Sequence, residues 1–207
     1  MNDQNKVLDP EGFLENASSP LEVFTKWYTE GKNLGLRNPD AMVLSTASAD
    51  HLPRSRVVLL KELRAQGLVF YTNYNSQKGR DLRANPNCTL LFYWDQLFRQ
   101  VHFSGRVEKL TREDSVKYWR ERPRASQLSQ WVSKQSQPVH DRTQLQAELS
   151  SAEILFKDKE IPCPEHWGGY LFTPTYVEFW VGRDGRFHDR HTYQLVESVW
   201  RGARLYP

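Results

Sequence analysis

Hydrophobic and polar positions follow two different periods along the chain, and each period predicts a different kind of element. In segment 19–35 the large apolar residues recur at helical spacing, at Leu21, Phe24, Trp27 and Tyr28. A serine precedes this run, Pro20 suits a first helical turn, and Gly31 or Gly35 suits the end. The pattern therefore predicts one amphipathic helix near the N-terminus.

Beyond this helix the chain changes to short β-branched and aromatic runs separated by turn-forming residues. These runs predict strands over segments 41–48, 54–63, 67–73, 88–94, 100–110, 167–182, 186–195 and 198–207. Helical patterns occupy segments 75–87, 111–122 and 141–156. Short strands that meander with turn signals indicate a mainly β protein with flanking helices, built on a small antiparallel barrel of Greek-key type.

The remaining global features narrow the class of protein. Residues 1–18 are polar and punctuated by proline, so we expect a flexible N-terminal arm before a single domain over 19–207. No signal peptide and no apolar run of membrane-spanning length is present, which predicts a cytoplasmic protein that does not bind a membrane. The net charge of +3 favours anionic ligands, but Lys and Arg are not concentrated in runs, which argues against a nucleic-acid-binding protein.

Metal and disulfide chemistry find little support. Cys88 and Cys163 lie far apart and have no ligand-spaced neighbours, so neither a disulfide framework nor a metal site is expected. His188 and His191 would point to opposite faces of a strand. The chain also lacks a nucleophile elbow, a P-loop and a dinucleotide fingerprint, so a bound cofactor would carry the reaction of any enzyme built on it.

Segment 122–137, RPRASQLSQWVSKQSQ, holds three cations, four serines, four glutamines and no acid. One interpretation is a solvated loop between helices. The other is a surface that closes around phosphate, because Arg, Lys, hydroxyl and backbone N–H groups bind phosphate and a carboxylate would repel it. Ser76 and Lys78 stand at the start of a predicted helix, where free N–H groups also favour anions.

A second candidate lies near the C-terminus. If Arg186 to Tyr193 forms a strand, Arg186, His188 and Arg190 project from one face. Such a basic row is either a solvated barrel face or the wall of an anion site. Arg54, Arg56 and Lys61 likewise bracket an apolar strand core, as solvated strand ends or as contacts to a flat phosphorylated ring.

Ten short motifs occur in an order that resembles one known family. They are RVVLLK (56–61), FYTN (70–73), SQKG (76–79), RQV (99–101), YWRERPRASQ (118–127), WVSKQS (131–136), WGGY (167–170), EFW (178–180), RFHDR (186–190) and RLYP (204–207). Over about residues 20–207 the chain resembles the pyridoxine/pyridoxamine 5′-phosphate oxidases. The resemblance implies a split β-barrel that binds flavin mononucleotide (FMN), and a homodimer with FMN at the subunit interface.

The same resemblance implies an activity. Such an enzyme oxidises pyridoxamine 5′-phosphate or pyridoxine 5′-phosphate to pyridoxal 5′-phosphate, uses O2 as acceptor and releases H2O2. Its small-molecule partners are therefore phosphorylated B6 vitamers and O2. FMN would take the hydride from the substrate C4′ carbon, while the protein supplies binding and orientation.

Position by position, the resemblance implies three overlapping sets of site residues. The FMN contacts would be Arg56, Val57, Val58, Leu59, Leu60, Lys61, Tyr71, Thr72, Lys78, Gln100, Gln135, Ser136, Trp180 and Arg190. The substrate contacts would be Lys61, Tyr118, Arg122, Ser126, Arg186 and His188. Arg186 and His188 would also be catalytic, with Arg186 orienting the substrate ring and His188 hydrogen-bonding or assisting proton movement.

Three positions depart from the family pattern. Gln77 stands where the family commonly has arginine, Val181 where glutamine is usual, and no arginine precedes Arg37, so no residue of an N-terminal lid is transferred. Two alternatives accompany the oxidase hypothesis. One is an FMN oxidase of the same fold that acts on another substrate, of the phenazine type. The other is a non-enzymatic flavin or polyanion binder.

Overall fold

The structure is a computed structural model, and it describes residues 19–207. The predicted N-terminal arm, residues 1–18, lies outside the described residues. The helices are α2 (Pro20–Asn33), α3 (Gln77–Ala84), α4 (Arg112–Glu121), α5 (Arg124–Val132) and α6 (Arg142–Leu155). The strands are β1 (Ala41–Ala47), β2 (Pro53–Leu59), β3 (Glu62–Arg64), β4 (Gly67–Asn73), β5 (Asn87–Trp94), β6 (Arg99–Lys109), β7 (Trp167–Val181), β8 (Asp189–Val196) and β9 (Val199–Leu205).

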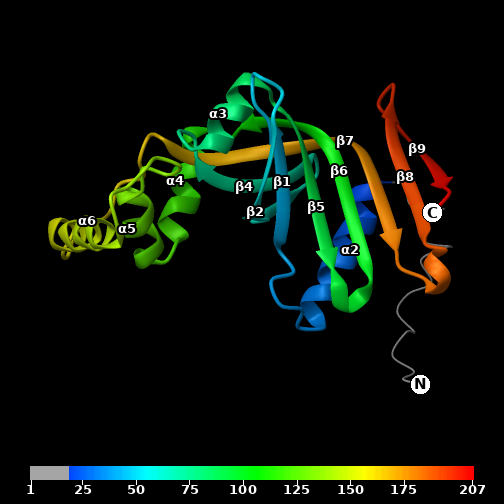
Figure 1. Ribbon diagram of the computed structural model, residues 1–207, viewed down its shortest axis with the longest axis horizontal. Helices are drawn as coiled ribbons and strands as arrows, with labels where there is room; N and C mark the ends of the chain where they lie inside the picture. Colours follow the sequence, from blue (N-terminus) through cyan, green and yellow to red (C-terminus); the bar gives the residue numbers. More distant parts are fainter. Residues whose placement is uncertain (1–18) are drawn as a thin grey trace.

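All strand pairs within the described residues are antiparallel, and they form one curled sheet in the order β2-β1-β5-β6-β7-β4-β3 (Figure 1). The pair β8 and β9 extends this sheet from β7. Within residues 19–207, five α-helices flank the sheet. The prediction of a mainly β, antiparallel barrel-like fold with flanking helices is confirmed.

The curled sheet closes at Leu60 and Lys61, the two residues that connect β2 with β3, which are the strands at the two ends of the order given above. The backbone N–H of Leu60 donates to the carbonyl of Asp40, and the N–H of Lys61 donates to the carbonyl of Val69, both at 2.8 Å. At this seam the pairing of the chain changes: β2, before it, pairs with β1, and β3, after it, pairs with β4. The prediction of one continuous strand over 54–63 is therefore wrong, because the chain turns a corner of the barrel and divides into β2 and β3.

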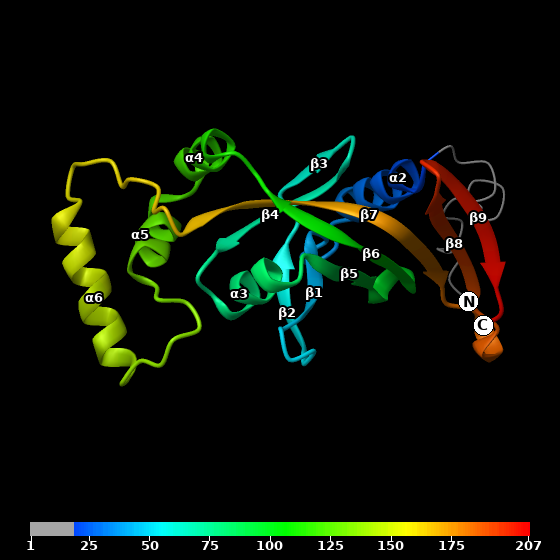
Figure 2. The ribbon, with the colours of Figure 1, turned by 90° about the horizontal axis from the view of Figure 1, so that it is seen from above.

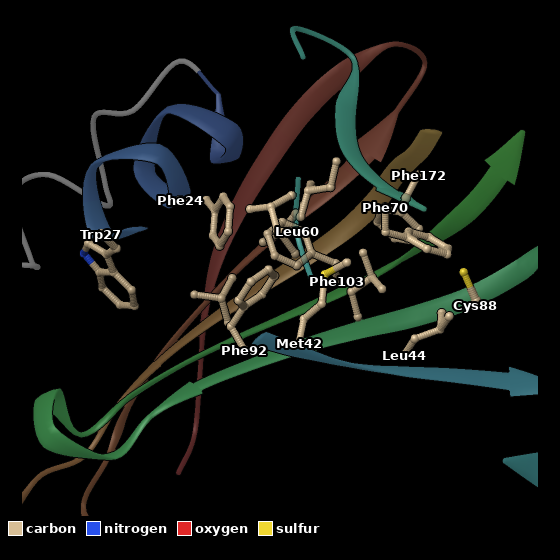
Figure 3. Close-up of a cluster of buried hydrophobic side chains, with 14 of the residues drawn as sticks. Phe24, Trp27, Met42, Leu44, Leu60, Phe70, Cys88, Phe92, Phe103 and Phe172 are labelled. Carbon is tan, nitrogen blue, oxygen red and sulfur yellow. The ribbon is translucent and has the colours of Figure 1, made fainter. Parts of the chain in front are cut away.

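Helix α2 packs its apolar face onto the inside of the curl. Ser19 caps the helix by accepting from the N–H of Leu21, and Gly35, at φ 70°, ends it in a left-handed turn. Phe24 meets Phe92 and Phe103 at ring centroid distances of 4.8 and 5.1 Å, within the aromatic cluster of Figure 3. This core fixes the sheet on which the candidate site is built.

A second hydrophobic cluster holds the helical end of the molecule together. It contains Trp119, Leu128, Ala152, Phe156, Ile161 and Trp167. Helices α4, α5 and α6 lie at one end of the long axis, and β8 and β9 lie at the other (Figures 1 and 2). The interpretation of 122–137 as a solvated loop is wrong for 124–132, because Pro123 begins a new helix and Leu128 buries its side chain in this cluster.

No helix among residues 19–207 is both long and apolar enough to cross a membrane.

Candidate functional site

One group of polar side chains gathers at the N-terminus of α3, and we call it the α3 cluster: Arg56, Ser76, Lys78, Gln135 and Ser136. Ser76 caps the helix, since its Oγ accepts from the N–H of Gly79 at 3.3 Å. The Nζ of Lys78 lies 3.0 Å from the Oε1 of Gln135. The Oγ of Ser136 accepts from the N–H of Gln77 at 3.1 Å. Two segments distant in sequence are thereby joined around a helix N-terminus, which favours anions.

Arg56 is held in this cluster by a buried acid, Asp81 of α3. Asp81 is 2% exposed, and its carboxylate lies 3.7 Å from a guanidinium nitrogen of Arg56 and 3.8 Å from one of Arg54. The carboxylate also accepts from the hydroxyl of Thr46 at 2.7 Å and from the Nε2 of Gln77 at 2.8 Å. One buried carboxylate therefore orders two arginines and the first residue of α3.

Lys78 is the cation of this cluster that has no carboxylate partner among residues 19–207. Burial and, to a smaller extent, the charge of Arg56 together lower the pKa of Lys78 to about 8. An anion that binds close to Lys78 would stabilise its charged form. A Cβ at Gly79 would lie 2.2 Å from the carbonyl oxygen of Tyr74, so only glycine permits this close turn. The donors and the uncompensated charge fit a phosphate group.

A second group lies between β4, α4 and the start of β7, and we call it the ring cluster: Tyr71, Tyr118, Arg122, Ser126 and Trp167. The rings of Tyr71 and Tyr118 stack at 4.0 Å between centroids, 19° from parallel. The Nη2 of Arg122 donates to the carbonyl oxygen of Ser126 at 3.4 Å. Tyr118, Arg122 and Ser126 are thus neighbours, although Pro123 separates their two helices.

Lys61 belongs to the surroundings of the ring cluster through Asp40. The Nζ of Lys61 lies 3.4 Å from a carboxylate oxygen of Asp40. Burial raises the pKa of Tyr118, Arg122 opposes that change, and the charge of Asp40 is among the smaller influences that raise it. Lys61 also directly precedes Glu62, whose carboxylate accepts from the hydroxyl of Tyr71 at 2.7 Å, so the backbone places Lys61 next to the ring cluster.

The acid-free segment touches both groups. Its first part supplies Arg122 and Ser126 to the ring cluster, and its last part supplies Gln135 and Ser136 to the α3 cluster. β4 makes the same connection, because Tyr71 stacks in the ring cluster while the Nδ2 of Asn73 donates to the carbonyl of Ser133 at 3.3 Å. Thr72, between them, is buried. Two anion-compatible groups therefore share two backbone segments.

A third group, the β8 cluster, consists of Gln100, Trp180, Arg190, His188 and Arg186. The first three form a row across adjacent strands, since Gln100 opposes Trp180 and Trp180 opposes Arg190 in register. The His188 ring lies 4.7 Å from the Trp180 ring. Glu178 holds Arg190 with an Oε1 to Nε distance of 2.7 Å.

The predicted strand face of Arg186, His188 and Arg190 is wrong. β8 begins at Asp189, and Arg186 lies in a short 3-10 turn with φ 62°, next to Gly185 at φ 65°. Two successive left-handed residues reverse the chain and interrupt strand alternation. The Nδ1 of His188 accepts from the N–H of Arg183 at 3.1 Å, so a neutral imidazole carries its proton on Nε2.

Within one chain the β8 cluster is remote from the other two groups. Trp167 and Trp180 stand near opposite ends of β7, thirteen positions apart (167 to 180), which corresponds to a separation on the order of 40 Å in an extended strand. Figure 2 shows β8 and α4 at opposite ends of the molecule. The structure therefore brings Arg56 together with Lys78 and places Arg122 on a connected segment, but it does not bring Arg190 to them.

The run Arg56–Lys61 presents its side chains to two faces. Val57 and Leu59 are exposed, whereas Leu60 is buried in the core at the seam. Their side chains cannot all line one pocket. β2 pairs only with β1 among the described strands, so its free backbone edge is the feature that the whole run shares.

Three residues with clear structural roles at these clusters were not predicted: Asp81, Trp167 as a single residue, and Glu178. Asp81 carried one local signal, the four-residue spacing from Gln77 on a helix. Trp167 and Glu178 carried none beyond their places in short motifs. Among residues 19–207, no three His, Cys, Asp or Glu side chains are grouped so as to hold a metal ion.

Comparisons with known proteins assign the family. A family model described as pyridoxamine 5′-phosphate oxidase matches residues 32–156, and one described as the pyridoxine 5′-phosphate oxidase C-terminal dimerisation region matches residues 167–207. A pyridoxine/pyridoxamine 5′-phosphate oxidase from Rubrobacter xylanophilus is 44% identical over 188 residues, which cover 91% of this chain and 87% of the relative.

Solved structures agree with this assignment. The crystal structure of PhzG from Burkholderia lata 383, in complex with tetrahydrophenazine-1-carboxylic acid, superimposes with a TM-score of 0.91 at 28% identity and covers 98% of each chain. A pyridoxamine 5′-phosphate oxidase-related, FMN-binding protein from Nostoc punctiforme shares the fold, with a TM-score of 0.75 at 15% identity over 91% of this chain and 98% of its own. The chain belongs to the pyridoxine/pyridoxamine 5′-phosphate oxidase family.

Proposed function

We propose that this protein is an FMN-dependent oxidase that converts pyridoxamine 5′-phosphate or pyridoxine 5′-phosphate to pyridoxal 5′-phosphate, with O2 as acceptor and H2O2 as second product. One observation carries the proposal: two cations in separate clusters, Lys78 and Arg122, both lack a carboxylate partner in the described chain. One acid-free segment joins them. A phosphorylated cofactor and a phosphorylated substrate need two such positions.

The α3 cluster is the proposed site of the FMN phosphate. Lys78 and Arg56 supply charge, the hydroxyl of Ser136 supplies a donor, and Asp81 orders the arginine from behind. The free backbone edge of β2 suits the polar rim of a flat ring. When bound, FMN would accept a hydride from the substrate C4′ carbon and pass both electrons to oxygen.

The ring cluster, with Lys61, is the proposed site of the substrate phosphate. Arg122 offers most of its N–H donors, and Tyr118 and Ser126 offer hydroxyl groups beside it. Asp40 balances Lys61, so the net charge of this region stays moderate before a substrate arrives. A substrate held here by its phosphate would have its ring fixed in position beside the flavin, so the reaction step would lose no further translational entropy.

The β8 cluster would complete the site from a second copy of the chain, in a homodimer with FMN at the interface. Support comes from the match of residues 167–207 to a C-terminal dimerisation region and from the distance between this cluster and the others within one chain. In an isologous dimer each site would receive Gln100, Trp180 and Arg190 from the opposite copy. His188, with its proton on Nε2, would donate to the substrate, and Arg186 would orient its ring.

One alternative has a specific observation in its favour. The high structural similarity to PhzG, solved with a tetrahydrophenazine carboxylic acid, suggests a tricyclic acid as substrate. The greater identity to the pyridoxine/pyridoxamine phosphate oxidases, 44% against 28%, favours the phosphorylated vitamers.

Anaerobic mixing tests the proposal directly. FMN-loaded protein mixed with pyridoxamine 5′-phosphate should lose the visible absorbance of its flavin and regain it when air is admitted, with formation of pyridoxal 5′-phosphate. The same protein mixed with tetrahydrophenazine-1-carboxylic acid is the comparison. Bleaching by the tricyclic acid alone would select the alternative, and no bleaching by either compound would reject both oxidase assignments.

A further inference from the structure

Arg122 is bound by the protein in an unusual way for a half-buried cation. Arg54, Arg56, Arg64, Arg99 and Arg190 all lie within salt-bridge distance of a carboxylate. For Arg122, the side-chain hydrogen bond in the described chain is the 3.4 Å contact to Ser126. A guanidinium carries five N–H donors, so most of those of Arg122 are not used by the protein.

Two indole rings hold Arg122 instead of a carboxylate. Its Cζ lies 4.7 Å from the ring centroid of Trp167 and 5.6 Å from that of Trp119. The two indoles meet edge to face, with centroids 4.9 Å apart at 67°. A ring face attracts a cation through its quadrupole, and it neither cancels the charge nor occupies the N–H donors. These two indole rings, of Trp119 and Trp167, form a slot that fixes Arg122 and leaves it able to bind an anion.

Trp167 is not the residue that core packing alone would select. Its side chain is fully buried, and its Nε1–H has no acceptor among residues 19–207, whereas the Nε1–H of Trp119 donates to Ile161 at 2.8 Å. A buried donor without an acceptor is destabilising, so Phe or Leu would satisfy a purely apolar position better. Tryptophan offers the strongest ring face for a cation.

We propose that Trp167 is a positioning residue for the substrate phosphate, which acts by holding the Arg122 guanidinium against its indole face. This inference rests on the proposed function, since it assigns Arg122 to a phosphorylated substrate. The backbone of Trp167 is itself anchored, because the Nη1 of Arg112 donates to its carbonyl at 3.1 Å. Its ring is also stacked 13° from parallel on Tyr71, at 5.3 Å. The indole is therefore rigid enough to set the direction of Arg122.

The test compares Trp167→Leu and Trp167→Phe in the wild-type chain and in an Arg122→Gln background. We expect Trp167→Leu to raise the KM for pyridoxamine 5′-phosphate about tenfold with kcat nearly unchanged, and Trp167→Phe to recover most of the loss. In the Arg122→Gln background the same changes should raise KM no further. The Kd of FMN, measured by quenching of flavin fluorescence, should stay constant because the α3 cluster is intact.

Two results would overturn the inference: an equal rise of KM in both backgrounds, or a loss of FMN affinity in step with KM. If Trp167→Leu does not fold, Trp167→Phe carries the test, with a KM rise of about threefold that disappears in the Arg122→Gln background. Calorimetric titration of inorganic phosphate into the FMN-loaded protein gives a readout independent of turnover. Weaker phosphate binding by Trp167→Leu would support the slot even if pyridoxamine 5′-phosphate failed to reduce the flavin, whereas unchanged phosphate binding would reject it.

Discussion

The ammonium group of Lys78 lies 3.0 Å from the amide oxygen of Gln135, and no carboxylate of the described chain pairs with it. A neutral acceptor holds the lysine in place but does not stabilise its charge as an acid would. Burial therefore dominates, and the pKa of Lys78 falls from its ordinary 10.5 to about 8. Anion binding at the α3 cluster should therefore be coupled to protonation of Lys78.

The first prediction concerns protons taken up with FMN. Bound phosphate should raise the pKa of Lys78 back toward its ordinary value, so at about pH 9 binding draws a proton from the buffer. Calorimetric titrations in two buffers of different ionisation enthalpy measure this uptake. Lys78→Met should abolish it, while Lys134→Met, at an exposed position nearby, should not. Identical heats in both buffers for the wild type would contradict the assignment.

The same pKa fixes the sign of a stability change in the FMN-free protein. Between about pH 8 and pH 10.5 the unfolded chain holds a proton on Lys78 that the folded chain has lost. Stability contributed by this group therefore rises with pH through that window. With phosphate bound the rise should disappear, and denaturant melts at several pH values, with and without FMN, check both statements.

A second prediction concerns the buried acid. Asp81→Asn keeps the shape of the side chain but removes the charge that lies between Arg54 and Arg56. We expect a loss of about 1–3 kcal/mol in the free energy of unfolding, because two partly buried guanidinium groups lose their counter-charge. Urea denaturation measures it. Glu153→Gln on the exposed face of α6 is the matched control and should change stability little.

Gln77 provides a third prediction. Its amide donates to Asp81 and accepts from Arg80, so it adds no charge at the start of α3. Gln77→Arg should tighten FMN binding by about tenfold, the effect of one charge-assisted contact. Gln77→Met, similar in length and uncharged, should not tighten it. Retention of flavin during dialysis and the Kd from fluorescence quenching report the change, and an unaltered Kd for Gln77→Arg would place position 77 outside the phosphate site.

Mixing two defective variants tests the shared site. Lys78→Met damages the α3 cluster and Arg190→Leu damages the β8 cluster, so each variant alone should be inactive. If each site draws these clusters from different copies, half the dimers in an equal mixture are mixed and carry one intact site, which restores about a quarter of the activity.

The control mixture pairs Lys78→Met with Arg122→Leu, whose two positions lie on connected segments of one chain. No mixed dimer then contains an intact site, so activity should not return. Recovery in both mixtures, or in neither, would argue against a site built from two copies.

Local signals in the sequence were enough to predict most elements. β4 occupies the predicted residues 67–73, and α2 begins at the serine cap and ends before the glycine that its pattern indicated. Such features depend on neighbouring residues only. The strand over 186–188 failed because the left-handed backbone at Gly185 and Arg186 interrupts an alternation that is otherwise regular.

The site was predictable in its residue types and only partly in its geometry. Uncompensated cations in an acid-free segment pointed to anions. The role of Asp81 depends on Thr46 and Arg56, which β1 and β2 bring to α3 from far away in sequence. The slot of Trp119 and Trp167 around Arg122 likewise exists only after β7 has joined the sheet.

The seam at Leu60 and Lys61 gives the assembly of this molecule an order in time. β1 with β2 and β3 with β4 are hairpins that can form early, but β4 becomes fixed only when β7, made much later in synthesis, lies beside it. Lys61 stands at that junction. A nascent chain that ends before β7, residues 167–181, thus has every residue of the α3 cluster but lacks the strand that pairs with β4. Under the proposed function, flavin loading would therefore follow the synthesis of β7.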